Sequence, residues 1–142
     1  MIFVDTGFFF ALSAKEEKIR HPQARELLAS LRGQRLSDVL ITTDQVVLET
    51  LTLIQTSVEK NFHARAVEVG EQLYSEKLAR IYRTSFDEHL EAFAYLRQHK
   101  DKRYSAVDCL SFVVMLKLGI KEAWTFDKHF EHRFIARPGP AR

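Results

Sequence analysis

Short apolar runs alternate with longer amphipathic stretches along the chain. The longer stretches carry apolar residues three and four positions apart, the spacing of one helix face. The apolar runs have the length and composition of buried strands, with the third run the weakest. We expect strands at 2–5, 39–42, 78–82, 122–126 and 133–136. We expect helices from Gly7 to about 14, from Pro22 to Gly33, from Thr43 or Asp44 through Ile54, over about 60–75, from Ser85 onward, and over 105–118.

Strands separated by helices favour a parallel sheet with helices on both faces. We therefore predict one α/β domain, a three-layer sandwich with a central parallel sheet of four to five strands. No repeat, linker or low-complexity tract indicates a second domain. The expected domain covers 1–137, and the short tail 138–142, rich in Pro and Gly, is expected to be disordered.

Composition narrows the class of protein without identifying its chemistry. The formal net charge of +2 over 142 residues permits a nucleic-acid partner only where basic residues cluster. The single cysteine, Cys109, excludes an intrachain disulfide and fits a reducing cytoplasm. The first apolar run lacks a preceding basic residue and is interrupted by Asp5, so it does not fit a signal peptide. No stretch approaches the roughly 18 apolar residues of a membrane span.

Most of the 19 acidic residues lie in polar stretches, but Asp5, Glu49, Asp108 and Asp127 lie among apolar residues. In a parallel sheet, strands end and crossover helices begin at the same edge. Asp5 and Asp127 end predicted strands, and Asp108 falls in the first turn of a helix. Glu49 is about five residues into its helix, on the order of 7.5 Å from the start. All four can therefore line the crevice in which open α/β sheets bind ligands.

Four carboxylates in one partly desolvated crevice repel one another and need protons or a cation. Hard divalent cations such as Mg²⁺ or Mn²⁺ prefer oxygen ligands. Such a site suits hydrolysis at phosphorus, because bound metals polarise the phosphoryl oxygen and activate water.

Each acid alone also has a purely structural explanation. Asp5 or Asp127 could cap a helical turn, and Ser105 with Asp108 forms a capping-box sequence. Glu49 could pair with an arginine. Their coincidence at one edge of the sheet is harder to explain in this way, and it favours a functional role.

With these residues assembled, the chain resembles PIN-domain ribonucleases, and most closely the VapC-type toxins of prokaryotic toxin–antitoxin pairs. The similarity rests on FVDTGFFFAL, TTDQVVLETLTLI, YSAVDCLSFVVM and AWTFDKHF, which follow the family's order across almost the whole chain. The resemblance implies a PIN-like fold and a Mg²⁺- or Mn²⁺-dependent endoribonuclease. It also implies an RNA substrate, a small antitoxin partner, a homodimer and a cytoplasmic location.

By the same resemblance, Asp5, Glu49, Asp108 and Asp127 are the catalytic, metal-coordinating acids. The resemblance also implies supporting roles for Thr6 and Thr125 near the metal, and Ser105 is a further supporting candidate.

Two other features of the sequence bear on its function. A basic run precedes the helix of Asp108 and could bind RNA phosphates, with an aromatic ring for base stacking, or could be a solvated connection. Its members are Arg97, Lys100, Lys102, Arg103 and Tyr104. His129 and His132 lack further Cys or His at zinc-ligand spacing, so we expect them at the surface.

Other phosphoryl-transfer classes fit poorly. An aspartate-nucleophile phosphatase needs a second Asp where this chain has Gly7, and no GxxxxGK[ST] loop is present. A receiver-type signalling domain needs an acceptor Asp and a strand-end Lys at positions that are not evident. Two alternatives remain: a non-catalytic PIN-like module that binds RNA or protein, and a housekeeping RNA-processing nuclease.

Overall fold

The computed structural model describes residues 1–140, which form a five-stranded parallel sheet with strand order β3-β2-β1-β4-β5. The predicted parallel sheet is therefore confirmed. The strands are β1 (Ile2–Val4), β2 (Leu40–Thr43), β3 (Arg80–Tyr82), β4 (Glu122–Thr125) and β5 (Ile135–Pro138).

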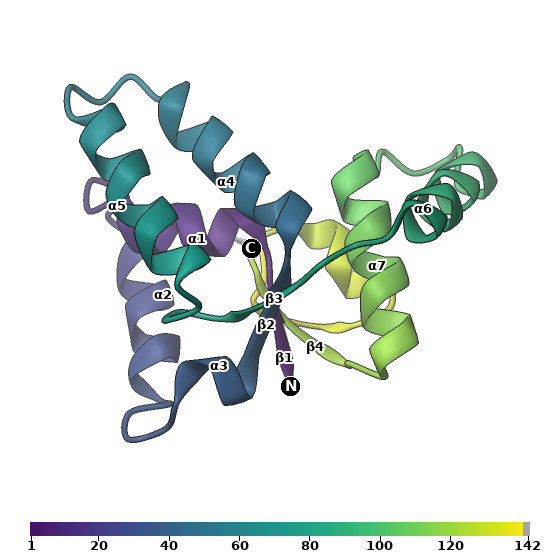
Figure 1. Cartoon of the computed structure of the whole chain (residues 1–142), viewed down its shortest axis with the longest axis horizontal. Coiled ribbons are helices and arrows are strands. Elements are labelled where there is room, and N and C mark those ends of the chain that lie inside the picture. The colour runs from purple at the N-terminus through teal and green to yellow at the C-terminus, as the bar shows by residue number, and fades with distance from the viewer. Residues whose placement is uncertain (141–142) are drawn as a thin grey trace.

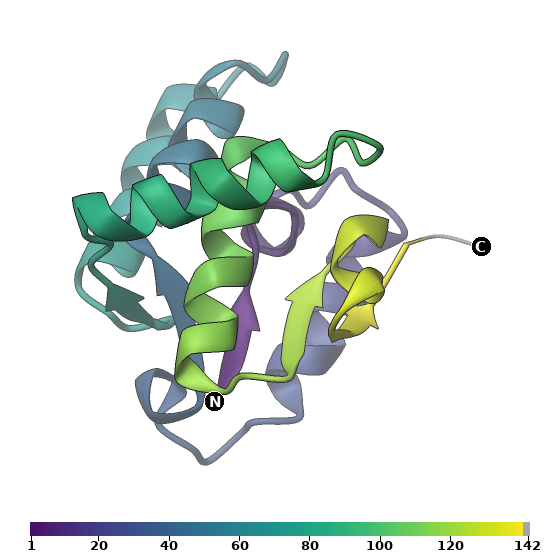
Figure 2. The ribbon, with the colours of Figure 1, turned by 90° about the vertical axis from the view of Figure 1, so that its right-hand side faces the viewer.

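Helices cover both faces of the sheet, as a three-layer sandwich requires. In Figure 1, α1, α2 and α5 lie on one side of the strands, and α6 and α7 lie on the other. Figure 2 shows α7 running along the sheet with α6 crossing over it. The helices are α1 (Thr6–Ser13), α2 (Arg20–Ala29), α3 (Leu36–Val39), α4 (Asp44–Gln55), α5 (Phe62–Tyr74), α6 (Phe86–Gln98) and α7 (Ala106–Leu118).

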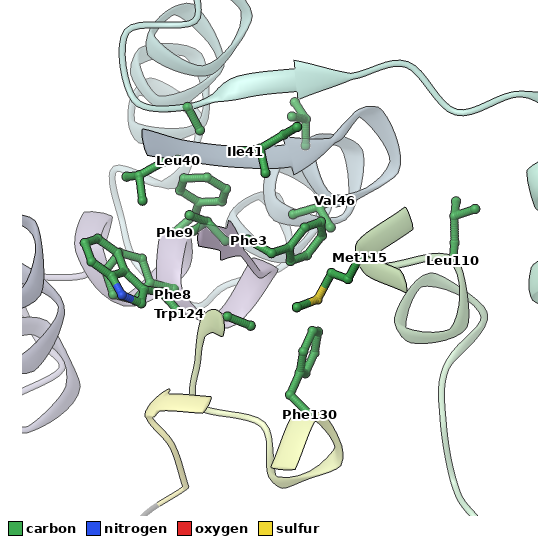
Figure 3. Packing of buried hydrophobic residues seen from close by; sticks show 14 of the residues in the cluster. Phe3, Phe8, Phe9, Leu40, Ile41, Val46, Leu110, Met115, Trp124 and Phe130 are labelled. Atoms are coloured by element: carbon green, nitrogen blue, oxygen red, sulfur yellow. The ribbon is translucent and has the colours of Figure 1, made fainter. Parts of the chain in front are cut away.

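The core packs helices onto the sheet through aromatic and aliphatic side chains (Figure 3). The phenylalanines that follow the first strand explain part of this packing. Phe8 and Phe9 are buried, and the Phe8 ring lies 5.1 Å from the ring of Trp124 on β4. On the other face, Phe130 stacks against Phe3 with ring centroids 6.3 Å apart. The strand that carries Asp5 is thus held from both sides.

Local sequence signals set several helix ends. Ser85 and Glu88 form a capping box at the start of α6, and the Thr43 hydroxyl accepts the Val46 N–H at the start of α4. Gly119 ends α7 with φ of +70°, a left-handed conformation that glycine adopts without steric cost. These signals act within one helical turn, which is why the sequence alone reveals them.

The structure departs from the predicted elements in several places. Helix α2 begins at Arg20, two residues before the expected start at Pro22, and ends at Ala29, before the expected stop at Gly33. Helix α3 and the short 3₁₀ helix η1 (Lys128–His132) were not predicted, because four or five residues are too few to show periodicity. Strand β5 begins two residues later than expected and runs through Pro138. The expected domain boundary at 137 therefore falls inside a strand, and the Gly139 N–H donates to the Thr125 carbonyl. Residues 141–142 of the predicted tail lie outside the described residues.

Among residues 1–140, no helix is long and apolar enough to cross a membrane.

Candidate active site

The four acids singled out from the sequence line one cavity of about 490 Å³. Asp5 follows β1, Glu49 lies on α4, Asp108 is in the first turn of α7, and Asp127 follows β4. Parallel strands and the helices that follow them supply this edge, which is the geometry expected from the order of elements. The predicted convergence of the four carboxylates is thus present in the structure.

Asp5 is the most deeply buried of these acids, at 5% exposure. Its backbone N–H donates to the Trp124 carbonyl, and the Thr125 hydroxyl donates to Asp5 Oδ2 over 2.9 Å. Burial, followed by the negative charge of Asp108, raises the pKa of Asp5 from 3.8 to about 7. The site therefore places a carboxyl group where its charge is unfavourable without a nearby cation.

Asp108 both takes part in the capping box of α7 and lines the cavity. Its Oδ2 accepts the Ser105 N–H over 3.1 Å, and its own N–H donates to Ser105 Oγ over 3.0 Å. Burial is the largest influence on its pKa, which is raised despite the Ser105 hydrogen bond. The capping box thus fixes the direction of a carboxylate that also lines the cavity, and this gives Ser105 its supporting position.

Thr125 connects the acids that follow β1 and β4. The Asp127 N–H donates to Thr125 Oγ1 over 2.9 Å, while the same hydroxyl donates to Asp5. Asp127 in turn uses its Oδ1 to accept the His129 N–H over 2.9 Å at the start of η1. One buried hydroxyl therefore sets the relative positions of two carboxyl groups.

Thr6 and Glu49 also contribute oxygen atoms to the lining of the cavity. Thr6 Oγ1 is buried and makes no hydrogen bond to any of residues 1–140. Glu49 is half-buried and reaches the cavity from α4. A buried hydroxyl without a partner costs free energy, so an additional group in the cavity would satisfy it.

Comparison with known proteins identifies the family. The PIN domain profile matches residues 2–133. A protein named 23S rRNA-specific endonuclease VapC20, from Mycobacterium tuberculosis, is 34% identical over 130 residues, which is 92% of each chain. The chain belongs to the PIN-domain family. Its homology to a VapC toxin over this length confirms the predicted VapC-type endoribonuclease.

Solved structures support the same assignment. The crystal structure of Mycobacterium tuberculosis VapC20, described as a Sarcin-Ricin loop cleaving toxin, has a TM-score of 0.79 at 32% identity. The aligned region covers 93% of this chain and 94% of the VapC20 chain. FitAcB from Neisseria gonorrhoeae has a TM-score of 0.64 at 16% identity, with 97% and 98% covered, and shows the shared fold alone.

His129 of this PIN domain lines the acidic cavity, and the expectation of a surface position for it is wrong. Its Nδ1 lies 3.5 Å from Asp108 Oδ2 and 3.5 Å from Asp127 Oδ1. The expectation failed because η1, which turns the ring inward, was not predicted. The spacing Asp-x-His directly after a strand was the available signal. His132 is exposed, as expected.

The basic run divides into residues near the cavity and residues away from it. Arg103 lines the cavity. Arg97 stacks on Phe93 of the same helix, at 4.9 Å from the ring centroid, and Lys102 lies 3.8 Å from the carboxylate of Asp101. Lys100 is exposed. Of these four cations, only Arg103 is placed to act at the site itself.

Tyr104 does not offer the open stacking face expected of it. Its ring is 9% exposed and packs edge-on against Phe112, with centroids 5.1 Å apart. Its hydroxyl lies 2.7 Å from His132 Nδ1. The contact with α7 buries the ring, which leaves no open face for base stacking. Arg20, which lies outside this basic run, also lines the cavity, with its guanidinium 5.3 Å from the Phe126 ring centroid.

Replacing Thr125 with valine should weaken divalent-metal binding about 10- to 100-fold, the usual cost of losing a group that orients a ligand. The change preserves shape but removes the hydrogen bonds to Asp5 and Asp127. Mn²⁺ titration by calorimetry measures the effect. Thr52→Val, at an exposed position on α4, is the control. Unchanged affinity in Thr125→Val would show that this hydroxyl does not organise the site.

Proposed function

We propose that this chain hydrolyses RNA phosphodiester bonds with Asp5, Glu49, Asp108 and Asp127 holding Mg²⁺ or Mn²⁺. The observation that carries the proposal is the gathering of these four carboxyl groups in one cavity, where the pKa of Asp5 is raised to about 7 by burial and by Asp108. Such a cluster favours binding of a cation, because the cation removes the repulsion that burial strengthens.

The donor atoms suit a hard divalent cation. Carboxylate oxygens are the ligands such cations prefer, and the unpartnered hydroxyl of Thr6 adds another oxygen in the same cavity. A cation bound there would supply polarisation of the phosphoryl oxygen and activation of water.

The protein's own part is to orient these carboxylates and to admit a polyanion beside them. Thr125 holds Asp5 and Asp127, and Ser105 holds Asp108. Arg20 and Arg103 line the same cavity, so their guanidinium groups can bind phosphate oxygens near the acids. Without such cations, the acidic cavity would repel RNA.

Homology supports the substrate and partners that we propose. VapC20 is named as a 23S rRNA-specific endonuclease, so a structured ribosomal RNA loop is the substrate we propose to test first. As a VapC-type toxin, the chain would be held inactive in the cytoplasm by a small antitoxin protein and would act as a homodimer. A harmless phenotype when the chain is expressed alone would instead favour a housekeeping nuclease.

Wild-type protein should cleave a ribosomal RNA loop with Mn²⁺ or Mg²⁺ and lose this activity in EDTA. Asp108→Asn should lower the cleavage rate about 100-fold or more, since even residues that only orient ligands contribute 10- to 100-fold. Gel analysis of end-labelled RNA measures both. Asp87→Asn, an exposed acid on α6, is the control and should cleave normally.

Two results would contradict this proposal. Cleavage that survives EDTA, or equal cleavage by wild type and Asp108→Asn, would exclude the metal-dependent mechanism. No cleavage of any RNA together with no metal binding would favour a non-catalytic binding module.

A further inference from the structure

We propose that His129 is an additional metal ligand in the acidic cavity and that its imidazole makes the site select Mn²⁺ over Mg²⁺. The proposal rests on the proposed function, because it concerns the cation that the four acids would hold. It adds a nitrogen donor to a set that otherwise consists of oxygen atoms.

The position of the ring carries the inference. Ligand atoms of Asp108, Asp127 and His129 all lie within 4.8 Å of one another. His129 Nδ1 is 3.5 Å from a carboxylate oxygen of each acid. Two atoms that occupy neighbouring positions of one octahedral ion at about 2.1 Å lie about 3.0 Å apart. Small side-chain movements of about 0.5 Å would therefore let the three side chains share an ion.

Hydrogen bonding within the protein does not account for this position. His129 Nδ1 is buried and makes no hydrogen bond to residues 1–140. A separation of 3.5 Å exceeds the usual length of an N–H···O bond. A buried nitrogen without a partner is unfavourable, and the Thr6 hydroxyl in the same cavity is in the same condition. A cation bound beside Asp108 and Asp127 would satisfy the His129 nitrogen.

The chain also holds the imidazole ring in a defined orientation. The His129 N–H donates to Asp127 Oδ1, which ties the first turn of η1 to a carboxylate of the site. The ring meets the buried Tyr104 ring edge-on, with centroids 5.2 Å apart. The Tyr104 hydroxyl lies 2.7 Å from His132 Nδ1. Tyr104 is thus a positioning residue for the His129 ring, and this role is consistent with its burial.

The nitrogen donor determines the choice of cation. Mg²⁺ favours an all-oxygen environment and keeps several waters. Mn²⁺ also favours oxygen ligands, but as a first-row transition metal it accepts an imidazole nitrogen more readily than Mg²⁺ does. A cavity with an imidazole beside Asp108 and Asp127 should therefore bind Mn²⁺ more tightly than Mg²⁺. The competing explanation is that a protonated imidazole merely balances the charge of the two carboxylates.

Pulsed electron paramagnetic resonance of Mn²⁺ bound to the full chain tests the inference directly. We expect nitrogen coupling to Mn²⁺ in the wild type that changes when histidine is labelled with ¹⁵N. The coupling should disappear in His129→Asn and persist in His63→Asn, an exposed histidine on α5. His129→Gln is a second variant should His129→Asn fold poorly. In calorimetric titrations, loss of the imidazole should lower Mn²⁺ affinity about 10-fold or more and lower Mg²⁺ affinity much less.

The outcomes separate this inference from the proposed function. Mn²⁺ binding to wild type without nitrogen coupling would overturn the inference and leave the metal-dependent nuclease intact, with the imidazole acting as a counter-charge. Nitrogen coupling that persists without His129, or equal losses for Mn²⁺ and Mg²⁺, would also overturn it. No Mn²⁺ binding by wild type would overturn the proposed function itself.

Discussion

Asp5→Asn should abolish RNA cleavage and, in the absence of metal, make the protein more stable at pH 8. The two effects have one cause, because the carboxylate that helps to bind a cation is destabilising when no cation is present. Asp5 is 5% exposed, and burial together with the charge of Asp108 raises its pKa to about 7. Asparagine has nearly the same shape, and its carbonyl oxygen can still accept the Thr125 hydroxyl proton.

The raised pKa of Asp5 determines whether Asp5→Asn is more or less stable than wild type at a given pH. Between pH 3.8 and about 7, folded Asp5 retains a proton that the unfolded chain has released. The free energy of unfolding therefore falls as pH rises through this window, by up to about 1.4 kcal/mol per pH unit. Asparagine does not titrate, so Asp5→Asn should be more stable than wild type by about 2–4 kcal/mol at pH 8 and nearly equal to it at pH 4.

Urea unfolding in EDTA at several pH values measures this difference. Asp87→Asn, which replaces an exposed carboxylate on α6, should show no comparable gain at pH 8. Added Mn²⁺ should then stabilise wild type but not Asp5→Asn, since a ligand that binds the folded state raises stability by mass action. An Asp5→Asn protein less stable than wild type at pH 8 would contradict the proposed cost of the buried charge.

The position of the acids was predictable because it depends on the order of elements. Asp5 and Asp127 end strands, and Asp108 starts a helix, so a parallel topology alone brings them to one edge. The apolar residues around them mark the strands clearly. The hydroxyl of Thr125 could be placed near the site only by family resemblance, because its contacts with Asp5 and Asp127 depend on side-chain rotamers.

The surroundings of the acids were less predictable, because they depend on contacts between distant segments. Tyr104 is in a basic run, but its ring is covered by Phe112 of α7 and lies beside His132 of η1. Arg20, the first residue of α2, lines the cavity, although the sequence predicted that this helix begins at Pro22. A pattern of apolar and polar residues does not contain these long-range contacts.

The same cavity therefore combines groups that favour folding with groups that oppose it. Capping bonds to Ser105 stabilise the start of α7 and orient Asp108, so the structural and functional explanations of that acid are compatible. Asp5 gains no equivalent compensation among residues 1–140, since its pKa stays raised despite the hydrogen bond from Thr125. Proteins commonly accept such local costs at active sites.

Glu88 is a buried acid outside the site. Its pKa is lowered, whereas the pKa of Asp5 is raised. Burial alone would raise its pKa, but hydrogen bonds from the Tyr82 hydroxyl, the Ser85 N–H and the Lys117 ammonium outweigh burial and lower the pKa from 4.5 to about 2. The side chain is 2% exposed. It joins edge strand β3 to α6 and α7, so its contribution should be to stability and not to catalysis.

Glu88→Gln should lower the free energy of unfolding by about 3 kcal/mol at pH 7, from the depressed pKa at about 1.4 kcal/mol per unit. Because the folded pKa is depressed, this stabilisation is fully present above pH 4.5 and is lost as pH falls toward 2. The difference between wild type and Glu88→Gln should therefore narrow steadily between pH 5 and pH 3. Urea unfolding across this range measures it, with Glu91→Gln on the exposed face of α6 as the control. A difference that is the same at pH 3.5 and pH 7 would show that lost packing, and not the charged hydrogen bonds, accounts for the effect.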